Sequence, residues 1–203
     1  MKLNPRYMML FASLILVLLY FFPIWSISLE APQYPEGLGL SIFINKIDGQ
    51  KEGDLQSING LNHYIGMKAI KPESIAELKI MPFFIAFMIL FGVLSAVFKK
   101  NYLILLWIGI FIVASAVGIY DFYKWEYDYG HNLSPMAIIK VPGMTYQPPL
   151  IGAKQLLNFR AFSMPDIGAY IAAGSIILAF FSFILNKKKV CKHIQKLQEK
   201  VTS

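Results

Sequence analysis

Two short segments of this chain each carry a histidine with methionines close by, and this combination of side chains can bind Cu(I). The first is INGLNHYIGMK, residues 58–68, and the second begins with HNLSPM at residue 131. Thioether sulfur and imidazole nitrogen favour Cu(I), whereas carboxylates and carbonyls favour hard ions. If the two segments fold together, their side chains could form one copper site. The candidate ligands are His63, Met67, His131, Met136 and Met144.

Two other interpretations of the same segments stay open. Asn62 precedes His63 and Asn132 follows His131, and such polar side chains often hold a loop by hydrogen bonds to its backbone. The segments could also dock a partner protein, because Tyr and Trp are enriched at binding hot spots. For the aromatic residues from 120 to 129, a belt at the lipid headgroups is a further alternative. The candidate docking residues are Asn62, Tyr64, Trp125, Tyr127, Tyr129 and Asn132.

The usual signatures of catalysis are missing from the sequence. It contains no G-x-S-x-G nucleophile motif, no H-E-x-x-H zinc motif and no glycine-rich phosphate loop. The acidic pair Glu126 and Asp128 lies among aromatic residues, and we expect both carboxylates to be solvated. We therefore predict a protein that is not an enzyme, with an enzyme acting on lipid or quinol as an alternative.

Four apolar stretches surround these segments and must position them. They cover residues 7–27, 82–98, 102–120 and 167–185. Each is close to the roughly 20 residues that a helix needs to cross a hydrocarbon core of ~30 Å. None holds an ionised side chain for ion transport or paired histidines for haem. We predict a mainly α membrane protein, a four-transmembrane-helix bundle with a small α+β extracytoplasmic cap formed by two long loops.

The distribution of charge indicates how the chain lies in its bilayer. Ten of the 19 lysines and arginines fall in residues 1–6, 99–101 and 186–203, together with one acid, Glu199. Positive residues concentrate on the cytoplasmic side, so we expect both termini inside and both long loops in the periplasm of a bacterial inner membrane. The net charge of +7 thus reflects topology, and no motif or basic face indicates nucleic acid. The first stretch lacks a small-x-small cleavage site, which favours a retained helix.

The predicted organisation follows from these stretches. It places helix 1 in 1–27, outer loop 1 in 28–81, helices 2 and 3 in 82–122, outer loop 2 in 123–166, helix 4 in 167–186 and a basic cytoplasmic tail in 187–203. Within the loops, the residue patterns predict a strand at 38–44, a hairpin-like turn at 47–54, a short interfacial helix beginning at Pro72 and a short helix at 155–162.

The two segments also carry a resemblance to a known family. GLNHYIGMK, and DYGHNLSPMAIIKVPGMTYQPPLIGAKQLLNF further on, resemble the NosB-type small multi-pass membrane proteins encoded with clade II nitrous oxide reductases. The similarity begins at LEAPQYPEGL, residues 29–38, and covers most of the chain. It implies an accessory role in nitrous oxide respiration, in which the protein docks, anchors or helps mature the periplasmic copper reductase. The resemblance brings no catalytic residues with it, and Cu(I) handling by the outer His and Met residues is the alternative.

Overall fold

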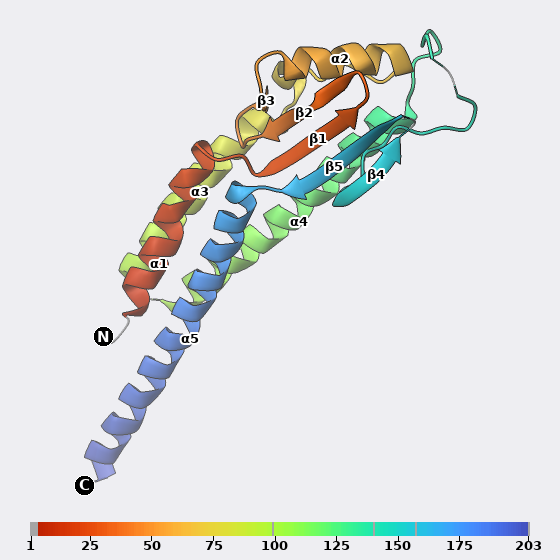
Figure 1. The fold of residues 1–203 in the computed structure, drawn as a ribbon. Helices are drawn as coiled ribbons and strands as arrows, with labels where there is room; N and C mark the ends of the chain where they lie inside the picture. The colour runs from red at the N-terminus through yellow and green to blue at the C-terminus, as the bar shows by residue number, and fades with distance from the viewer. Residues whose placement is uncertain (1–3, 99, 140, 157, 203) are drawn as a thin grey trace. The chain divides into compact units, whose positions relative to one another are not determined.

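The computed structural model describes residues 4–98, 100–139, 141–156 and 158–202. The chain divides into two compact units, which we call the helical unit and the sheet unit. The helical unit comprises Met1–Leu18, Phe83–Ser115 and Ile171–Ser203, and the sheet unit comprises Leu19–Pro82 and Ala116–Tyr170. Figure 1 labels the helices and strands along the chain.

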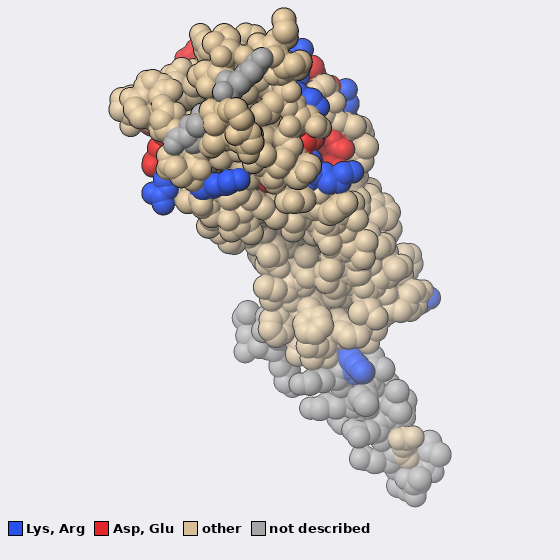
Figure 2. Space-filling model, turned by 90° about the vertical axis from the view of Figure 1, so that its right-hand side faces the viewer, with Lys and Arg blue, Asp and Glu red and all other residues tan. Residues whose placement is uncertain are grey.

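Three helices of the described residues are long and apolar enough to cross a membrane. They are α3 (Glu77–Phe98), α4 (Asn101–His131) and the first part of α5 (Ile167–Thr202), with a mean hydropathy between 2.1 and 2.5 in their apolar parts. Uncharged runs cover residues 80–98, 101–120 and 167–186. A broad zone of the surface without Lys, Arg, Asp or Glu is visible in Figure 2. Length and composition therefore indicate a multi-pass membrane protein.

The first apolar stretch is shorter as a helix than predicted. Helix α1 (Pro5–Leu14) continues as a 3₁₀ helix through Ile15–Tyr20, and strand β1 (Trp25–Ala31) follows after a turn. The predicted helix end at residue 27 is wrong, because Trp25 already pairs with strands on both sides of β1. Apolar side chains alone do not distinguish a membrane helix from a buried strand.

Serine side chains tie two helices of the helical unit together. Ser175 of α5 donates a hydrogen bond to the carbonyl of Ala12 in α1 at 2.5 Å. About two turns further along α5, Ser182 donates a hydrogen bond to the carbonyl of Pro5 at 2.6 Å. Both serines are buried. Small hydroxyl residues let apolar helices approach closely and hydrogen-bond across the contact.

The sheet unit is built on a five-stranded antiparallel sheet of order β3-β2-β1-β5-β4. The strands other than β1 are β2 (Tyr34–Ile42), β3 (Ile47–Gly49), β4 (Gly152–Leu156) and β5 (Phe159–Pro165). The predicted strand at 38–44 overlaps β2 and is confirmed in that part. Since β1 pairs with β5, strands from both predicted loops share one sheet.

The predicted short helix at 155–162 is wrong, because residues 155–156 and 159–162 belong to the paired strands β4 and β5. Lys154 lies opposite Ala161 and Gln155 lies opposite Arg160 in the β4–β5 pair. In β5, Ala161 and Ser163 are buried while Arg160 is exposed, which is the two-residue period of a half-buried strand. The residues QLLNF do not alternate between apolar and polar side chains, so the sequence pattern did not indicate this strand.

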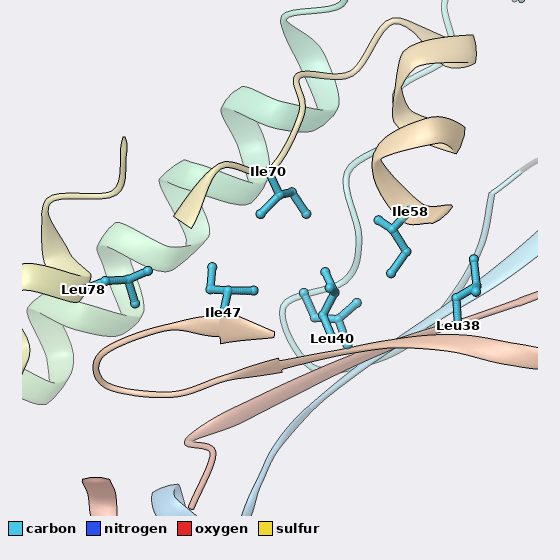
Figure 3. Close-up of a cluster of buried hydrophobic side chains, with 7 residues drawn as sticks. Leu38, Leu40, Ile47, Ile58, Ile70 and Leu78 are labelled. Carbon is cyan, nitrogen blue, oxygen red and sulfur yellow. The ribbon is translucent and has the colours of Figure 1, made fainter. Parts of the chain in front are cut away.

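One layer of buried side chains joins the sheet to helix α2 (Asp54–Ile65). Figure 3 shows Ile58 of α2 and Ile70, which follows it, pointing toward the strand residues Leu38, Leu40 and Ile47. The buried cluster comprises Ile27, Leu38, Leu40, Ile47, Ile58, Ile70 and Leu78. Segment 58–68 is therefore largely helical, with its apolar side fixed by this core.

Helix α4 is longer than the apolar stretch that predicted it. Its 31 residues span roughly 46 Å at ~1.5 Å per residue, more than a hydrocarbon core of ~30 Å. The uncharged run 101–120 suffices for a span, and residues 121–131 lie beyond it. Phe122, Trp125 and Tyr129 of this extension pack against the core of the sheet unit. The predicted loop beginning at residue 123 is therefore wrong up to His131, where the helix ends.

Candidate functional site

The two segments singled out in the sequence meet in the sheet unit. The carbonyl of Gly66, at the end of α2, accepts a hydrogen bond from the Ser134 amide at 2.8 Å. The carbonyl of Tyr64 accepts one from the Ile139 amide at 2.9 Å. We call residues 62–70, 128–139 and 141–147 together the junction. It contains the two segments that carry the candidate His and Met ligands, and hydrogen bonds between their backbones bring them together.

Gly66 is required where α2 ends. Its φ of 80° lies in the left-handed region, and its amide caps the helix through the carbonyls of Asn62 and His63. A Cβ at this position would lie 2.7 Å from the Cβ of Ala137. Glycine therefore both reverses the chain and allows the second segment to approach.

Asparagine side chains fix the chain after this turn. Asn59 accepts a hydrogen bond from the Ile70 amide at 2.7 Å and donates one to the Ile70 carbonyl at 3.0 Å. Asn62 donates to the Lys68 carbonyl at 3.4 Å. The backbone-holding interpretation of these side chains is therefore confirmed for Asn62.

Replacing Asn59 with alanine is expected to loosen the junction, because both hydrogen bonds to Ile70 are lost. The expected destabilisation is about 2 kcal/mol, at about 1 kcal/mol for each bond. Hydrogen exchange at the Ile70 amide would measure it. Gln56→Ala, at an exposed position of the same helix, is the control and should leave this exchange rate unchanged. An unchanged rate in Asn59→Ala would contradict the assignment.

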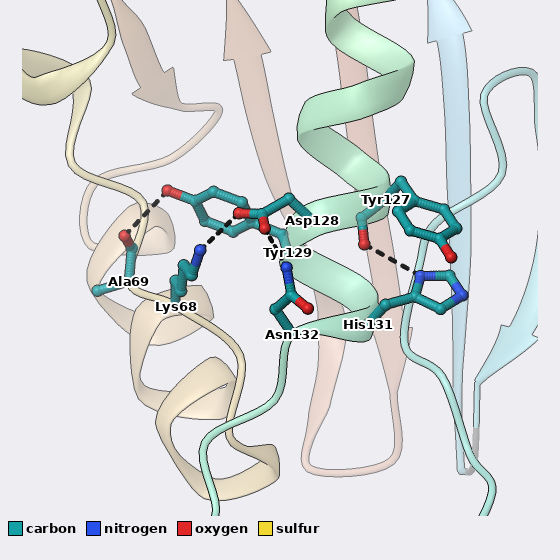
Figure 4. A network of polar contacts seen from close by, with 7 residues as sticks. All are labelled: Lys68, Ala69, Tyr127, Asp128, Tyr129, His131 and Asn132. Atoms are coloured by element: carbon teal, nitrogen blue, oxygen red, sulfur yellow. Dashed lines mark hydrogen bonds and ion pairs between the residues drawn. The ribbon is translucent and has the colours of Figure 1, made fainter.

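A polar network closes the outer side of the junction, as Figure 4 shows. Lys68 forms a salt bridge with Asp128 at 2.5 Å, and Asn132 also donates to the Asp128 carboxylate. The hydrogen bond from Lys68 is the main cause that holds the pKa of Asp128 below its ordinary value. The Tyr129 hydroxyl donates to the Ala69 carbonyl at 3.3 Å. These contacts orient α4 against the end of α2.

The predicted copper ligands have separate surroundings. The ring of His63 is exposed and lies against the edge of Tyr64. The ring of His131 stacks on Tyr127 with centroids 3.8 Å apart, and its Nδ1 lies 3.0 Å from the Tyr127 carbonyl. In the part of the chain that the structure describes, no three His, Cys, Asp or Glu side chains gather to hold a metal.

The methionines are divided as well. Met67 lines a cavity under the junction, Met144 is half-buried, and Met136 is 87% exposed. The three methionines therefore have different surroundings, and a copper site stays a prediction.

The predicted docking residues are divided between surface and core. Tyr64, Tyr127 and Asn132 are exposed. Asn62 is buried, and Trp125 and Tyr129 pack against the core of the sheet unit. The rings of this last pair cover the sheet core, and the headgroup-belt interpretation stays a prediction.

Sequence reasoning named Tyr64 for docking and Met136 for copper, but it missed three other exposed apolar residues of the junction, Ile138, Ile139 and Val141. Tyr64 is joined there by four exposed apolar side chains, and Met136 and Ile138 are 87% and 66% exposed. We call Tyr64, Met136, Ile138, Ile139 and Val141 the apolar surface. Its signal in the sequence is the run MAIIKV between Pro135 and Pro142, an apolar stretch too short for a helix that crosses a membrane. Exposed clusters of this kind mark interaction sites.

Glu126 was expected in solvent, but it is fully buried. Its position on α4, four residues after Phe122 and three before Tyr129, places it on the helix face that covers the sheet. Neither of its carboxyl oxygens has a hydrogen-bond partner among the described residues, and the buried Tyr146 hydroxyl also has none. Both residues line a cavity of about 60 Å³. Burial raises the pKa of Glu126 to about 8, so the carboxyl is mostly neutral at pH 7.

A larger cleft of about 680 Å³ lies along strands β1 and β2. Its lining includes both acidic and basic side chains, among them Glu30, Glu36, Lys51 and Arg160. The Lys51 ammonium donates to the Glu36 carbonyl at 2.6 Å. The cleft is a polar surface with mixed charge.

Comparison with protein-family models gives no match, and comparison with curated proteins gives no matching sequence. The function therefore has to be inferred from the junction and the cavity beneath it.

Proposed function

We propose that this chain is a membrane-anchored docking protein of nitrous oxide respiration, which docks, anchors or helps mature a periplasmic copper nitrous oxide reductase. The observation that carries the docking role is the apolar surface, which lies on the two segments that resemble NosB-type proteins. The copper reductase as partner comes from that resemblance. In this proposal the sheet unit lies in the periplasm, and the apolar helices anchor it in the inner membrane.

Four spans and cytoplasmic termini belong to the same proposal. Both termini can lie on one side only if the chain crosses the membrane an even number of times, so Pro5–Tyr20 has to be a span in addition to three longer helices. Its ten α-helical and six 3₁₀ residues extend over about 27 Å, since a 3₁₀ helix rises ~2.0 Å per residue. That length is close to a core of ~30 Å. The basic residues around 1–6, 99–101 and 186–203 then lie inside.

The composition of the apolar surface supports a protein partner. Tyr and Met are enriched at the centres of protein interfaces, and charged residues are depleted there. The hydrogen bonds of Tyr64 and Gly66 hold the two halves of the surface in one arrangement. A surface fixed in advance loses less conformational freedom when a partner binds.

The test is a mild-detergent pull-down of the tagged full chain from membranes of cells respiring nitrous oxide. Mass spectrometry should find the copper reductase in near-stoichiometric amount. Ile138→Asp should weaken the complex by about 2 kcal/mol, roughly 30-fold, as expected for a charge placed in an apolar hot spot. The control Asn45→Asp adds the same charge at the exposed β2–β3 turn. In Figure 1 this turn lies at the opposite end of the sheet from the segment between α4 and β4, which carries Ile138.

A preparation without the reductase would remove the anchoring role. Equal recovery with Ile138→Asp and with the wild type would instead remove the apolar surface from the interface.

A further inference from the structure

The cavity beneath the junction is walled mainly by apolar and aromatic side chains. Trp125 and Tyr129 of α4 line it together with Tyr146, and Phe159 of β5 closes another side. The rings of Trp125 and Tyr129 lie with their centroids 4.3 Å apart. Aromatic faces carry negative potential and attract cations, most strongly where water is excluded. Such a lining suits a small organic cation better than an anion.

The polar groups of the cavity are those that a cation would require. Glu126 is fully buried and Tyr146 is 2% exposed, and their oxygens have no hydrogen-bond partner among the described residues. A buried polar group without a partner is unfavourable, and a buried carboxylate is more so. A guest that donates several hydrogen bonds and carries positive charge would satisfy both groups at once.

The volume limits the size of that guest. A cavity of about 60 Å³ has room for a few water-sized groups, since one water needs ~10–15 Å³ on this kind of measure. Methylammonium, with one carbon and one nitrogen, fits this space and can donate hydrogen bonds, whereas tetramethylammonium donates none.

We propose that this cavity binds a small primary ammonium ion, whose N–H groups donate to the Glu126 carboxylate and the Tyr146 hydroxyl while its carbon contacts the aromatic rings. The proposal concerns a site inside the sheet unit and does not depend on the docking role.

Binding of a cation must compete with the proton on Glu126. With a pKa of about 8, about one carboxyl in ten is ionised at pH 7 and half at pH 8. Affinity for the ammonium ion should therefore rise about five-fold from pH 7 to pH 8, with release of a proton on binding.

Other titrating groups near the cavity do not change this expectation. Among the described lining residues, the only others are the phenols of Tyr129 on α4 and Tyr146 in the junction; the lining residues from α2 and the strands are uncharged. Burial raises the pKa of Tyr129, which keeps that phenol neutral over this range. The Lys68–Asp128 salt bridge lies at the surface.

Isothermal titration of the full chain in detergent micelles with methylammonium chloride tests the proposal. The titrations are run at pH 7 and pH 8, each in two amine-free buffers of different ionisation enthalpy, so that released protons are counted. We expect binding that is about five-fold tighter at pH 8. Glu126→Gln should lose at least ten-fold in affinity, and Tyr146→Phe about three- to ten-fold, the value of one hydrogen bond.

Potassium chloride and tetramethylammonium chloride are the matched salts, and neither should bind at the same concentrations. The proposal is overturned if methylammonium gives no binding heat, if Glu126→Gln binds it as well as the wild type, or if either matched salt binds equally. Loss of binding in Glu126→Gln should not come from unfolding, because glutamine removes a buried carboxyl without a hydrogen-bond partner among the described residues, and the unfolding temperature of the variant checks this directly.

Discussion

Replacing Glu126 with glutamine is expected to stabilise the sheet unit at pH 8 by on the order of 4 kcal/mol, and to leave its stability at pH 4 nearly unchanged. The carboxyl is buried without a partner, and burial raises its pKa from 4.5 to about 8. The folded protein therefore keeps a proton that the unfolded chain releases above pH 4.5. Glutamine has nearly the same shape and carries no charge, so it avoids this penalty.

The sign of the pH dependence follows from the raised pKa. Below pH 4.5 Glu126 is protonated in both the folded and the unfolded wild type, so its burial carries no ionisation penalty. As the pH rises from 4.5 to about 8, the free energy of unfolding falls by ~1.4 kcal/mol per pH unit. Above pH 8 both the folded and the unfolded protein are ionised at this group, and the dependence levels off.

Thermal unfolding and hydrogen exchange of the amides in α2 and in residues 121–131, measured between pH 4 and pH 9, check this expectation. The exposed residue Glu52 provides the control, because Glu52→Gln should keep the pH profile of the wild type. If Glu126→Gln also keeps that profile, the buried carboxyl does not control stability.

Gly130→Ala is expected to destabilise the sheet unit, because it disrupts the junction. A Cβ at this position would lie 2.3 Å from both the amide nitrogen and the Cα of Gln147. These are backbone atoms, so no side-chain rotation can relieve the clash. The Gly130 carbonyl also accepts the Tyr146 amide at 2.9 Å, and the segment that carries Tyr146 would have to move. Overpacking of this kind costs about 3 kcal/mol.

The unfolding temperature and the near-ultraviolet circular dichroism of the tyrosines would report the effect of Gly130→Ala. Gly60→Ala is the matched control, because its Cβ would meet nothing within 4 Å on the exposed side of α2. Alanine there should stabilise the helix by up to about 1 kcal/mol. A Gly130→Ala protein as stable as the wild type would show that the two segments do not pack as closely as described.

The sequence was informative where one physical pattern dominates a segment. Long uncharged runs predicted the apolar helices α3, α4 and α5, and the β-compatible residues of LGLSIFI predicted β2. For segment 58–68, one of the three interpretations that the sequence leaves open is that Asn62 holds the backbone, and Asn62 does so. These features depend on neighbouring residues, which the sequence displays directly.

The failures concern residues whose environment is set by distant parts of the chain. Trp25 pairs with Pro165, and nothing local distinguishes that strand from the end of a membrane helix. Glu126 looks like a solvated acid until it is known to line one cavity with distant residues such as Tyr146 and Phe159. The spacing of Phe122, Glu126 and Tyr129 places them on one helix face, which would have indicated that Glu126 is buried. This face is apparent only once residues 121–131 are recognised as helical.

The central position of the β1–β5 pair has a consequence for biogenesis. Trp25 cannot pair with β5 until Pro165 has been synthesised. At ~5–20 residues per second, synthesis of the chain between these residues takes on the order of ten seconds. Until then, β1 presents an open edge with apolar side chains, a template for pairing with other chains. Assembly of this protein should therefore depend on a chaperone that covers the β1–β2 hairpin during translation, and a chain truncated before β5 should aggregate rather than persist as a smaller folded unit.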